Sequence, residues 1–186
     1  MAGLGNPGSR YERTRHNAGF IAADKLCDQL GGGRMKKVKC KALYEICTLG
    51  SRNILIMKPH TYMNLSGEAV REAAAFYKIP IENIIVISDD INLDVGKMRV
   101  RKNGSDGGQR GLRSIITLMG DDKCPRIRLG VGKKPHPDYD LADWVLSEFS
   151  KDDQEKIFAC FGKAYDGLVK ILAGDFDGAM QICNGK

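Results

Sequence analysis

Five polar residues lie where the sequence indicates the start or end of a helix or strand, and side chains at such positions can converge on a pocket. They are Asn6, His16, Asn17, Asn64 and Asp89. An imidazole can take a proton from water, a carboxylate can fix its tautomer, and amides can position the water and a developing oxyanion. This combination indicates activation of water against an acyl carbon. The structural alternative is that His16 and Asn64 cap helices and Asp89 lies in a surface loop.

Water is the simplest nucleophile for such a site. No serine stands in a Gly-x-Ser-x-Gly turn, and none of the six cysteines belongs to a Cys-x-x-Cys pair. The irregular cysteine spacing predicts reduced, buried thiols, and the three histidines stand alone in the sequence. We therefore expect neither a structural metal nor a cofactor.

The elements that must position these residues alternate between helices and strands. Helices are predicted over residues 17–30, with Asn17 as the cap of this helix, over 66–78, along a segment bearing Leu112 and Met119, and from Ser150 onward. Strands are predicted over 39–49, 53–58, 84–88, 97–101 and 126–131. This order predicts an α/β single-domain three-layer fold over residues 1–186, with a mixed, mostly parallel central sheet flanked by helices. Because almost nothing precedes Gly3, a first strand there is expected to be short or clipped.

The distribution of charge favours a polyanionic partner. The net charge is +6, but residues 1–136 carry 24 basic and 13 acidic side chains, whereas residues 137–186 carry 5 and 10. Binding phosphates with a basic surface releases counterions, while the alternative is a solvated surface without a partner. The predicted basic strip consists of Lys97, Arg99, Arg101, Lys102, Arg110, Arg113, Arg126, Arg128, Lys133 and Lys134.

The composition argues against disordered, membrane-spanning and secreted proteins. Apolar residues make up 42% and charged residues 28%, which is typical of a globular protein. The longest aliphatic run covers only residues 84–87, whereas a membrane span needs about 20 apolar residues. The first residues do not follow the pattern of a secretory signal, so we expect a cytoplasmic protein.

Residues 3–8 match the dinucleotide-binding pattern Gly-x-Gly-x-x-Gly, but their context does not fit that function. The pattern requires a preceding strand, a helix at the third glycine and an acidic residue at the end of a second strand. Here the helix begins only near Asn17, and Asp24 falls inside it. A nicotinamide or flavin oxidoreductase is therefore the weakest interpretation, and a tight turn that positions Asn6 is the stronger one.

Four motifs follow one another along the chain. They are Gly-Leu-Gly-Asn-Pro-Gly-x-x-Tyr-x-x-Thr-Arg-His-Asn-Ala-Gly at 3–19, Lys-Pro-x-Thr-Tyr-Met-Asn-Leu-Ser-Gly at 58–67, Ser-Asp-Asp at 88–90 and Gly-Ser-x-Gly-Gly-x-x-Gly-Leu at 104–112. This series resembles the signatures of the bacterial-type peptidyl-tRNA hydrolase family. The resemblance implies a monomeric, metal-independent α/β esterase that cleaves the bond between peptide and tRNA and so recycles tRNA for translation.

The resemblance also implies a role for each matching residue. His16 falls on the catalytic base, Asp89 on the carboxylate that keeps it in the proton-accepting form, and Asn6 on the amide that separates N-blocked from free aminoacyl esters. The remaining matches contact the tRNA end or substrate, or line the pocket: Tyr11, Tyr62, Asn64 and Met63. Tyr62 stands where the family usually has Phe, and its aromatic face is still available for stacking on the terminal adenine.

The sequence departs from the family at Gln109 and Arg110, which replace the usual His and Asn. A guanidinium has five donors and no acceptor, so Arg110 cannot copy an amide that accepts a hydrogen bond, although it can bind a phosphate at the 3′ end. This departure favours an alternative function, that of a non-catalytic RNA-binding relative on the same fold. The joint presence of His16 and Asp89 favours the enzyme, because a pure binder needs no such pair.

Overall fold

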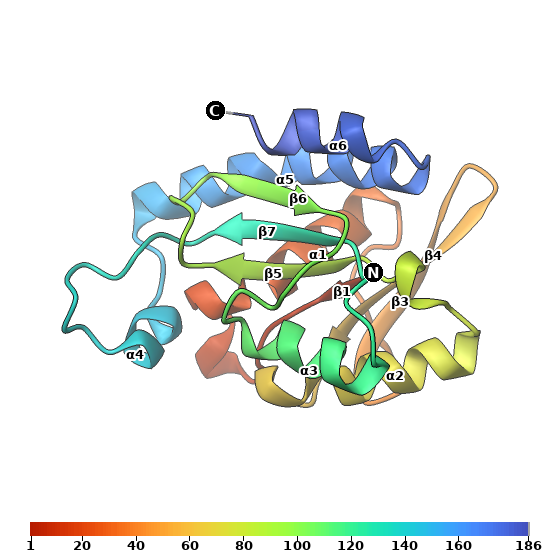
Figure 1. The fold of residues 1–186 in the computed structure, drawn as a ribbon, viewed down its shortest axis with the longest axis horizontal. Helices are drawn as coiled ribbons and strands as arrows, with labels where there is room; N and C mark the ends of the chain where they lie inside the picture. Colours follow the sequence, from red (N-terminus) through yellow and green to blue (C-terminus); the bar gives the residue numbers. More distant parts are fainter. Residues whose placement is uncertain (186) are drawn as a thin grey trace.

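A computed structural model of the protein describes residues 1–185, which contain one seven-stranded mixed sheet (Figure 1). Its strands are β1 (Ala2–Gly3), β2 (Lys37–Lys39), β3 (Ala42–Leu49), β4 (Arg52–Pro59), β5 (Val86–Asp90), β6 (Met98–Arg101) and β7 (Arg126–Gly130). They lie in the order β2-β3-β4-β1-β5-β7-β6. The neighbours β4, β1, β5 and β7 are parallel, whereas β2–β3, β3–β4 and β6–β7 pair antiparallel.

Helices cover both faces of this sheet, which confirms the predicted three-layer α/β fold. On one face lie α1 (Ala18–Gln29), α5 (Lys151–Leu172) and α6 (Phe176–Cys183), and on the other lie α2 (Ser66–Tyr77) and α3 (Arg110–Met119) (Figure 1). The short α4 (Leu141–Leu146) lies beyond the carboxyl ends of β5 and β7. Single 3₁₀ turns are η1 (Ser9–Tyr11), η2 (Arg15–Asn17), η3 (Met63–Leu65) and η4 (Ile81–Asn83).

The predicted elements differ from the observed ones mainly at their ends. The helix predicted over 66–78 ends at Tyr77, because Lys78 adopts a left-handed φ of 55°. The strand predicted over 84–88 occupies Val86–Asp90, so that Asp89 lies within the strand and not after it. Asn17 occupies the predicted N-cap position of the first helix, but its side chain makes no capping hydrogen bond. The short elements β2, α4 and α6 were not predicted from the sequence.

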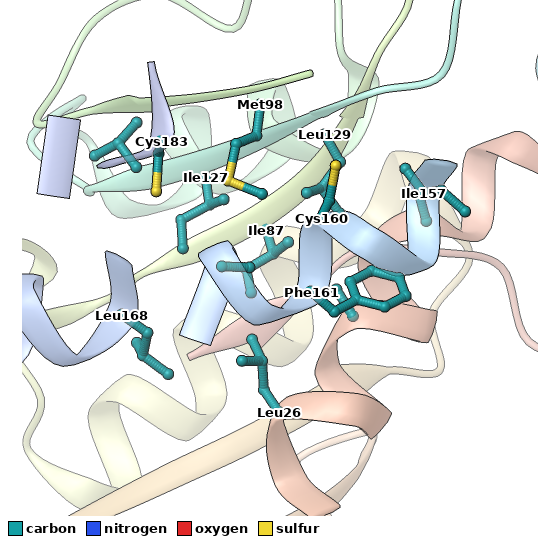
Figure 2. Packing of buried hydrophobic residues seen from close by; sticks show 14 of the residues in the cluster. Leu26, Ile87, Met98, Ile127, Leu129, Ile157, Cys160, Phe161, Leu168 and Cys183 are labelled. Atoms are coloured by element: carbon teal, nitrogen blue, oxygen red, sulfur yellow. The ribbon is translucent and has the colours of Figure 1, made fainter. Parts of the chain in front are cut away.

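The larger core lies between the sheet and the helices α1, α5 and α6 (Figure 2). Ile87 and Leu129 of neighbouring strands, Leu26 of α1 and Leu168 of α5 belong to this buried cluster. Burial of each such side chain contributes about 1.5–3 kcal/mol relative to its exposed state. Because β5 is also covered on its other face, where Val86 packs, the strand is held firmly up to its carboxyl end.

Gly19 allows the first turn of α1 to lie directly on β1 and β5. A Cβ atom at Gly19 would lie 2.4 Å from the Ile87 carbonyl oxygen and 2.5 Å from the Leu4 carbonyl oxygen. We expect Gly19→Ala to lower the free energy of unfolding in urea by about 1–3 kcal/mol, because backbone atoms cannot move away cheaply. Gly162→Ala on α5 is the control, because nothing lies within 4 Å of its added Cβ. Equal stability of the two variants would contradict this packing.

Candidate active site

A cavity of about 520 Å³ lies where the chain leaves the carboxyl ends of β1 and β5. Seven of the eight predicted site residues line it: Asn6, His16, Tyr62, Met63, Asn64, Asp89 and Arg110. The eighth, Tyr11, lies on η1 and is not among the described residues that line the cavity. Its ring instead packs against Arg10, whose guanidinium carbon lies 4.5 Å from the ring centre.

The imidazole of His16 and the carboxylate of Asp89 are in direct contact. His16 Nδ1 lies 2.8 Å from Asp89 Oδ2, and the two side chains are 16% and 4% exposed. Since an ionised carboxylate can only accept, the hydrogen between them is carried by Nδ1. The other ring nitrogen, Nε2, is then the proton acceptor of the pair, as general-base chemistry requires.

Strand β5 brings both acidic residues of its carboxyl end into the site. Asp90 is buried, and its Oδ2 lies 2.9 Å from Arg128 Nη2 on the neighbouring strand β7. Asp90 Oδ1 also accepts a hydrogen bond from the Asn92 amide at 2.9 Å. The charge of Asp90 is therefore compensated within the sheet, whereas Asp89 is the carboxylate that contacts His16.

Asn6 is held from both sides by hydrogen bonds. The Asn17 side chain accepts from the Asn6 amide at 2.8 Å and donates to the Asn6 carbonyl at 3.0 Å. Asn6 Oδ1 accepts from the Met63 amide at 2.8 Å. This last contact fixes the orientation of the Asn6 side chain, because a backbone N–H can only face the carbonyl oxygen. The Nδ2 end of Asn6 is thereby the end that can donate to a substrate carbonyl.

The turn before α2 places Tyr62 and Asn64 at the mouth of the cavity. Tyr62 has φ 56° and ψ 159°, a backbone conformation that is costly for a side chain larger than that of glycine, and it is 51% exposed. Such strain at an exposed aromatic residue is typical of a functional site. Asn64 lies inside η3, and no side chain caps α2 at Leu65, so the alternative that Asn64 is a helix cap is wrong.

Two parts of the site were not predicted from the sequence. Gln109 donates to Asp89 Oδ1 at 3.0 Å. The two residues are 20 positions apart, and no local sequence pattern predicts this contact. The helix α4 contributes the apolar side chains of Leu141, Val145 and Leu146 to the cavity wall. Its only local signal is Asp140, whose side chain caps the helix by accepting from the Ala142 and Asp143 amides.

The predicted basic strip is only partly a surface feature. Arg126 is 2% exposed and donates to backbone carbonyls, so its assignment to a phosphate-binding surface is wrong. Arg128 is 25% exposed and paired with Asp90. The side chains that do lie exposed are Lys97, Arg99, Arg101, Lys102, Arg110, Arg113 and Lys133.

Within residues 1–185, no helix combines the length and the apolar character that crossing a membrane requires. Over the same residues, no group of three or more His, Cys, Asp or Glu side chains is placed to hold a metal ion.

An imidazole–carboxylate pair that faces a cavity is an arrangement typical of hydrolases that use general-base chemistry. The family model described as peptidyl-tRNA hydrolase matches residues 1–186. The chain therefore belongs to the peptidyl-tRNA hydrolase family and is a hydrolase.

Similar proteins agree with this assignment. A peptidyl-tRNA hydrolase of Caldicellulosiruptor bescii is 48% identical over 185 residues, covering 100% of this chain and 96% of that protein. One from Thermoanaerobacter sp. (strain X514) is 45% identical over 185 residues, covering 100% and 98%. The crystal structure of the Acinetobacter baumannii peptidyl-tRNA hydrolase superimposes with a TM-score of 0.92 at 30% identity, covering 99% of this chain and 93% of that one.

Proposed function

We propose that this hydrolase cleaves the ester between an N-blocked aminoacyl group and the ribose of tRNA, with His16 as the general base. The proposal rests on one observation, the 2.8 Å contact between His16 Nδ1 and Asp89 Oδ2 at the wall of the cavity. Asp89 holds the imidazole so that Nε2 faces the reaction, and it stabilises the imidazolium formed when Nε2 takes a proton. A neutral imidazole is the form of His16 that starts the reaction.

The reaction then proceeds by attack of water on the ester carbonyl. His16 Nε2 takes one proton from the water as the new C–O bond forms, and the carbonyl oxygen becomes an oxyanion. Asn6 and Asn64 orient the peptide and share the oxyanion through their amide donors. The bond between the carbonyl carbon and the ribose oxygen breaks, and the imidazolium returns its proton to that oxygen.

The tRNA end is assigned to the exposed side of the same cavity. Tyr62 presents an aromatic ring for the terminal adenine, and Arg110, at the first residue of α3, presents a guanidinium to phosphate. Tyr11, on η1, contacts the tRNA outside the cavity. The exposed basic side chains of 97–113 bind the acceptor stem through its backbone and not through its bases.

The substrate class is tested by comparing two esters. N-acetylaminoacyl-tRNA is expected to be cleaved rapidly by the wild-type protein, with or without EDTA, and the unblocked aminoacyl-tRNA only slowly. We expect Asn6→Ala and Asn6→Asp to reduce the ratio of these two rates by about tenfold, the equivalent of one lost hydrogen bond. Both variants lose the Nδ2 donor, whereas only the alanine loses the acceptor for the Met63 amide.

The two variants therefore separate substrate binding from local structure. If only Asn6→Ala lowers the ratio, Asn6 acts through Met63 and not through the peptide. If neither variant changes it, the assignment of Asn6 to the peptide is wrong. If the wild-type protein binds tRNA but cleaves neither ester, the proposed chemistry itself is wrong, and the RNA-binding alternative replaces it.

We also propose that residues 1–186 form one domain that acts as a cytoplasmic monomer. One continuous sheet carries strands from Ala2 to Gly130, and α5 and α6 pack back onto it, which supports a single folding unit. Light scattering is expected to give the mass of one chain, and the mass of two would contradict the monomer.

A further inference from the structure

The side-chain amide of Gln109 contacts three groups from different parts of the chain. Its Oε1 accepts from the Leu112 amide at 2.8 Å and thereby caps α3. Its Nε2 donates to Asp89 Oδ1 at 3.0 Å and lies 3.0 Å from Met63 Sδ. Gln109 thus connects the beginning of α3 to the carboxylate that holds His16.

The helix cap determines which end of this amide faces Asp89. The Leu112 N–H is a donor, so it requires the carbonyl oxygen of Gln109 and excludes the flipped orientation. The NH₂ group is consequently the end directed at Asp89 Oδ1. A flipped amide would present an oxygen to an ionised carboxylate and would leave the first turn of α3 without its cap.

We propose that Gln109 is a positioning residue that orients Asp89 for catalysis, an inference that rests on the proposed role of His16. One carboxylate oxygen of Asp89 is occupied by Gln109 and the other by His16 Nδ1, at 3.0 and 2.8 Å. These two contacts prevent the carboxylate from rotating about its χ2 bond. The imidazole is thereby kept in a single orientation before substrate binds, which electrostatic catalysis requires.

The conformation of the loop before α3 places the Gln109 side chain next to Asp89. Gly107 and Gly108 have φ of 58° and 86°, and Asp106 accepts from the Gly108 amide at 2.7 Å. At Gly111 an added Cβ would lie 2.7 Å from Met63 Sδ and 3.1 Å from Gln109 Oε1. Gly107 and Gly108 therefore allow the turn, and Gly111 leaves the space in which Gln109 reaches Asp89.

Gln109→Glu distinguishes positioning from a purely structural role. A glutamate at this position has the same size and still accepts from the Leu112 amide, and its negative charge suits a helix N-terminus. It cannot act as the neutral NH₂ donor to Asp89. We expect a loss of thermal stability, because the new carboxylate faces the buried Asp89 at the position of the lost donor. We also expect a fall in kcat of about 10–100-fold and a KM within about threefold of wild type.

The pH–rate profile provides a second readout. The added carboxylate favours the protonated imidazole, so the acidic limb of kcat/KM is expected to move up by about one pH unit. Other charged groups at the cavity, namely Asp90, Arg110, Arg128 and Asp140, are the same in both proteins and do not cause the shift. Gln181→Glu, at an exposed position of α6, adds the same charge and is expected to change neither kcat nor the profile.

Three outcomes separate the possible explanations. Wild-type kcat and pH profile in Gln109→Glu would overturn the inference, whatever happens to stability. Loss of stability with unchanged kcat would also overturn it and leave Gln109 as a helix cap only. Full activity in His16→Ala, measured beside these variants, would instead refute the proposed function on which the inference rests.

Discussion

Replacing His16 by alanine is expected to lower the rate of ester cleavage by about 100- to 10,000-fold, the usual contribution of a general base. The protein should remain folded, because His16 lies in a 3₁₀ turn outside the buried hydrophobic clusters. Affinity for tRNA should also remain, since the exposed basic side chains of 97–113 are untouched. The measurement is single-turnover release of N-acetylaminoacyl groups, beside tRNA binding by fluorescence anisotropy.

The matched control is His136→Ala. His136 is exposed, and it is not among the described residues that line the cavity, so its loss should leave the rate unchanged. Imidazole added to the His16→Ala protein should restore part of the rate, because truncation leaves a space of that size beside Asp89. Wild-type activity in His16→Ala would show that another group, or the oxyanion contacts alone, carries the reaction.

The sequence predicted the layers of this fold because burial leaves a periodic pattern. The aliphatic run 84–87 is explained by the two clusters that cover β5, with Val86 on one face and Ile87 on the other. The ends of strands are harder to predict, since a polar residue such as Asp89 can lie within a strand when hydrogen-bond partners compensate its charge. Short elements such as β2 and α4 span too few residues to show a period.

At the candidate active site, too, some residues can be predicted from the sequence, whereas others become evident only in the folded structure. The sequence predicts His16, Asp89 and Asn6 as site residues because their types suit one reaction and because they fall within motifs of a known family, and in the structure all three line one cavity. Gln109 was noted only as a departure from that family. Its contact with Asp89 depends on how the loop before α3 folds back over β5, and this is a tertiary property that spacing along the chain does not encode.

Arg126 shows the same limit for charged residues. The alternation along β7 placed Arg126 and Arg128 on one face, and from the sequence both were expected to be exposed. In the structure the backbone around Gly104 and Asp122 closes over Arg126. A guanidinium with five donors can serve carbonyl groups as well as phosphates, so composition alone could not separate the two roles.

Arg126→Met is therefore expected to destabilise the fold and not to weaken tRNA binding directly. The guanidinium donates to the carbonyls of Gly104, Ser105, Asp122 and Cys124, the last three at 2.7–3.1 Å. Methionine fills similar space but leaves these acceptors unpaired, and each buried unpaired group costs about 1–3 kcal/mol. We expect a loss of about 3–5 kcal/mol in the free energy of unfolding in urea, because water can reach some of the carbonyls.

Arg101→Met completes this test, because Arg101 is the residue paired with Arg126 across β6 and β7 but is exposed. Its replacement should change stability by less than about 0.5 kcal/mol, as for most surface positions, and should weaken tRNA binding and reduce its salt dependence. Of the two neighbouring arginines, Arg126 would then contribute to stability and Arg101 to tRNA binding. Equal effects of the two replacements on stability would contradict the burial of Arg126. Equal effects on tRNA affinity in the folded proteins would show that Arg126 contributes to tRNA binding after all.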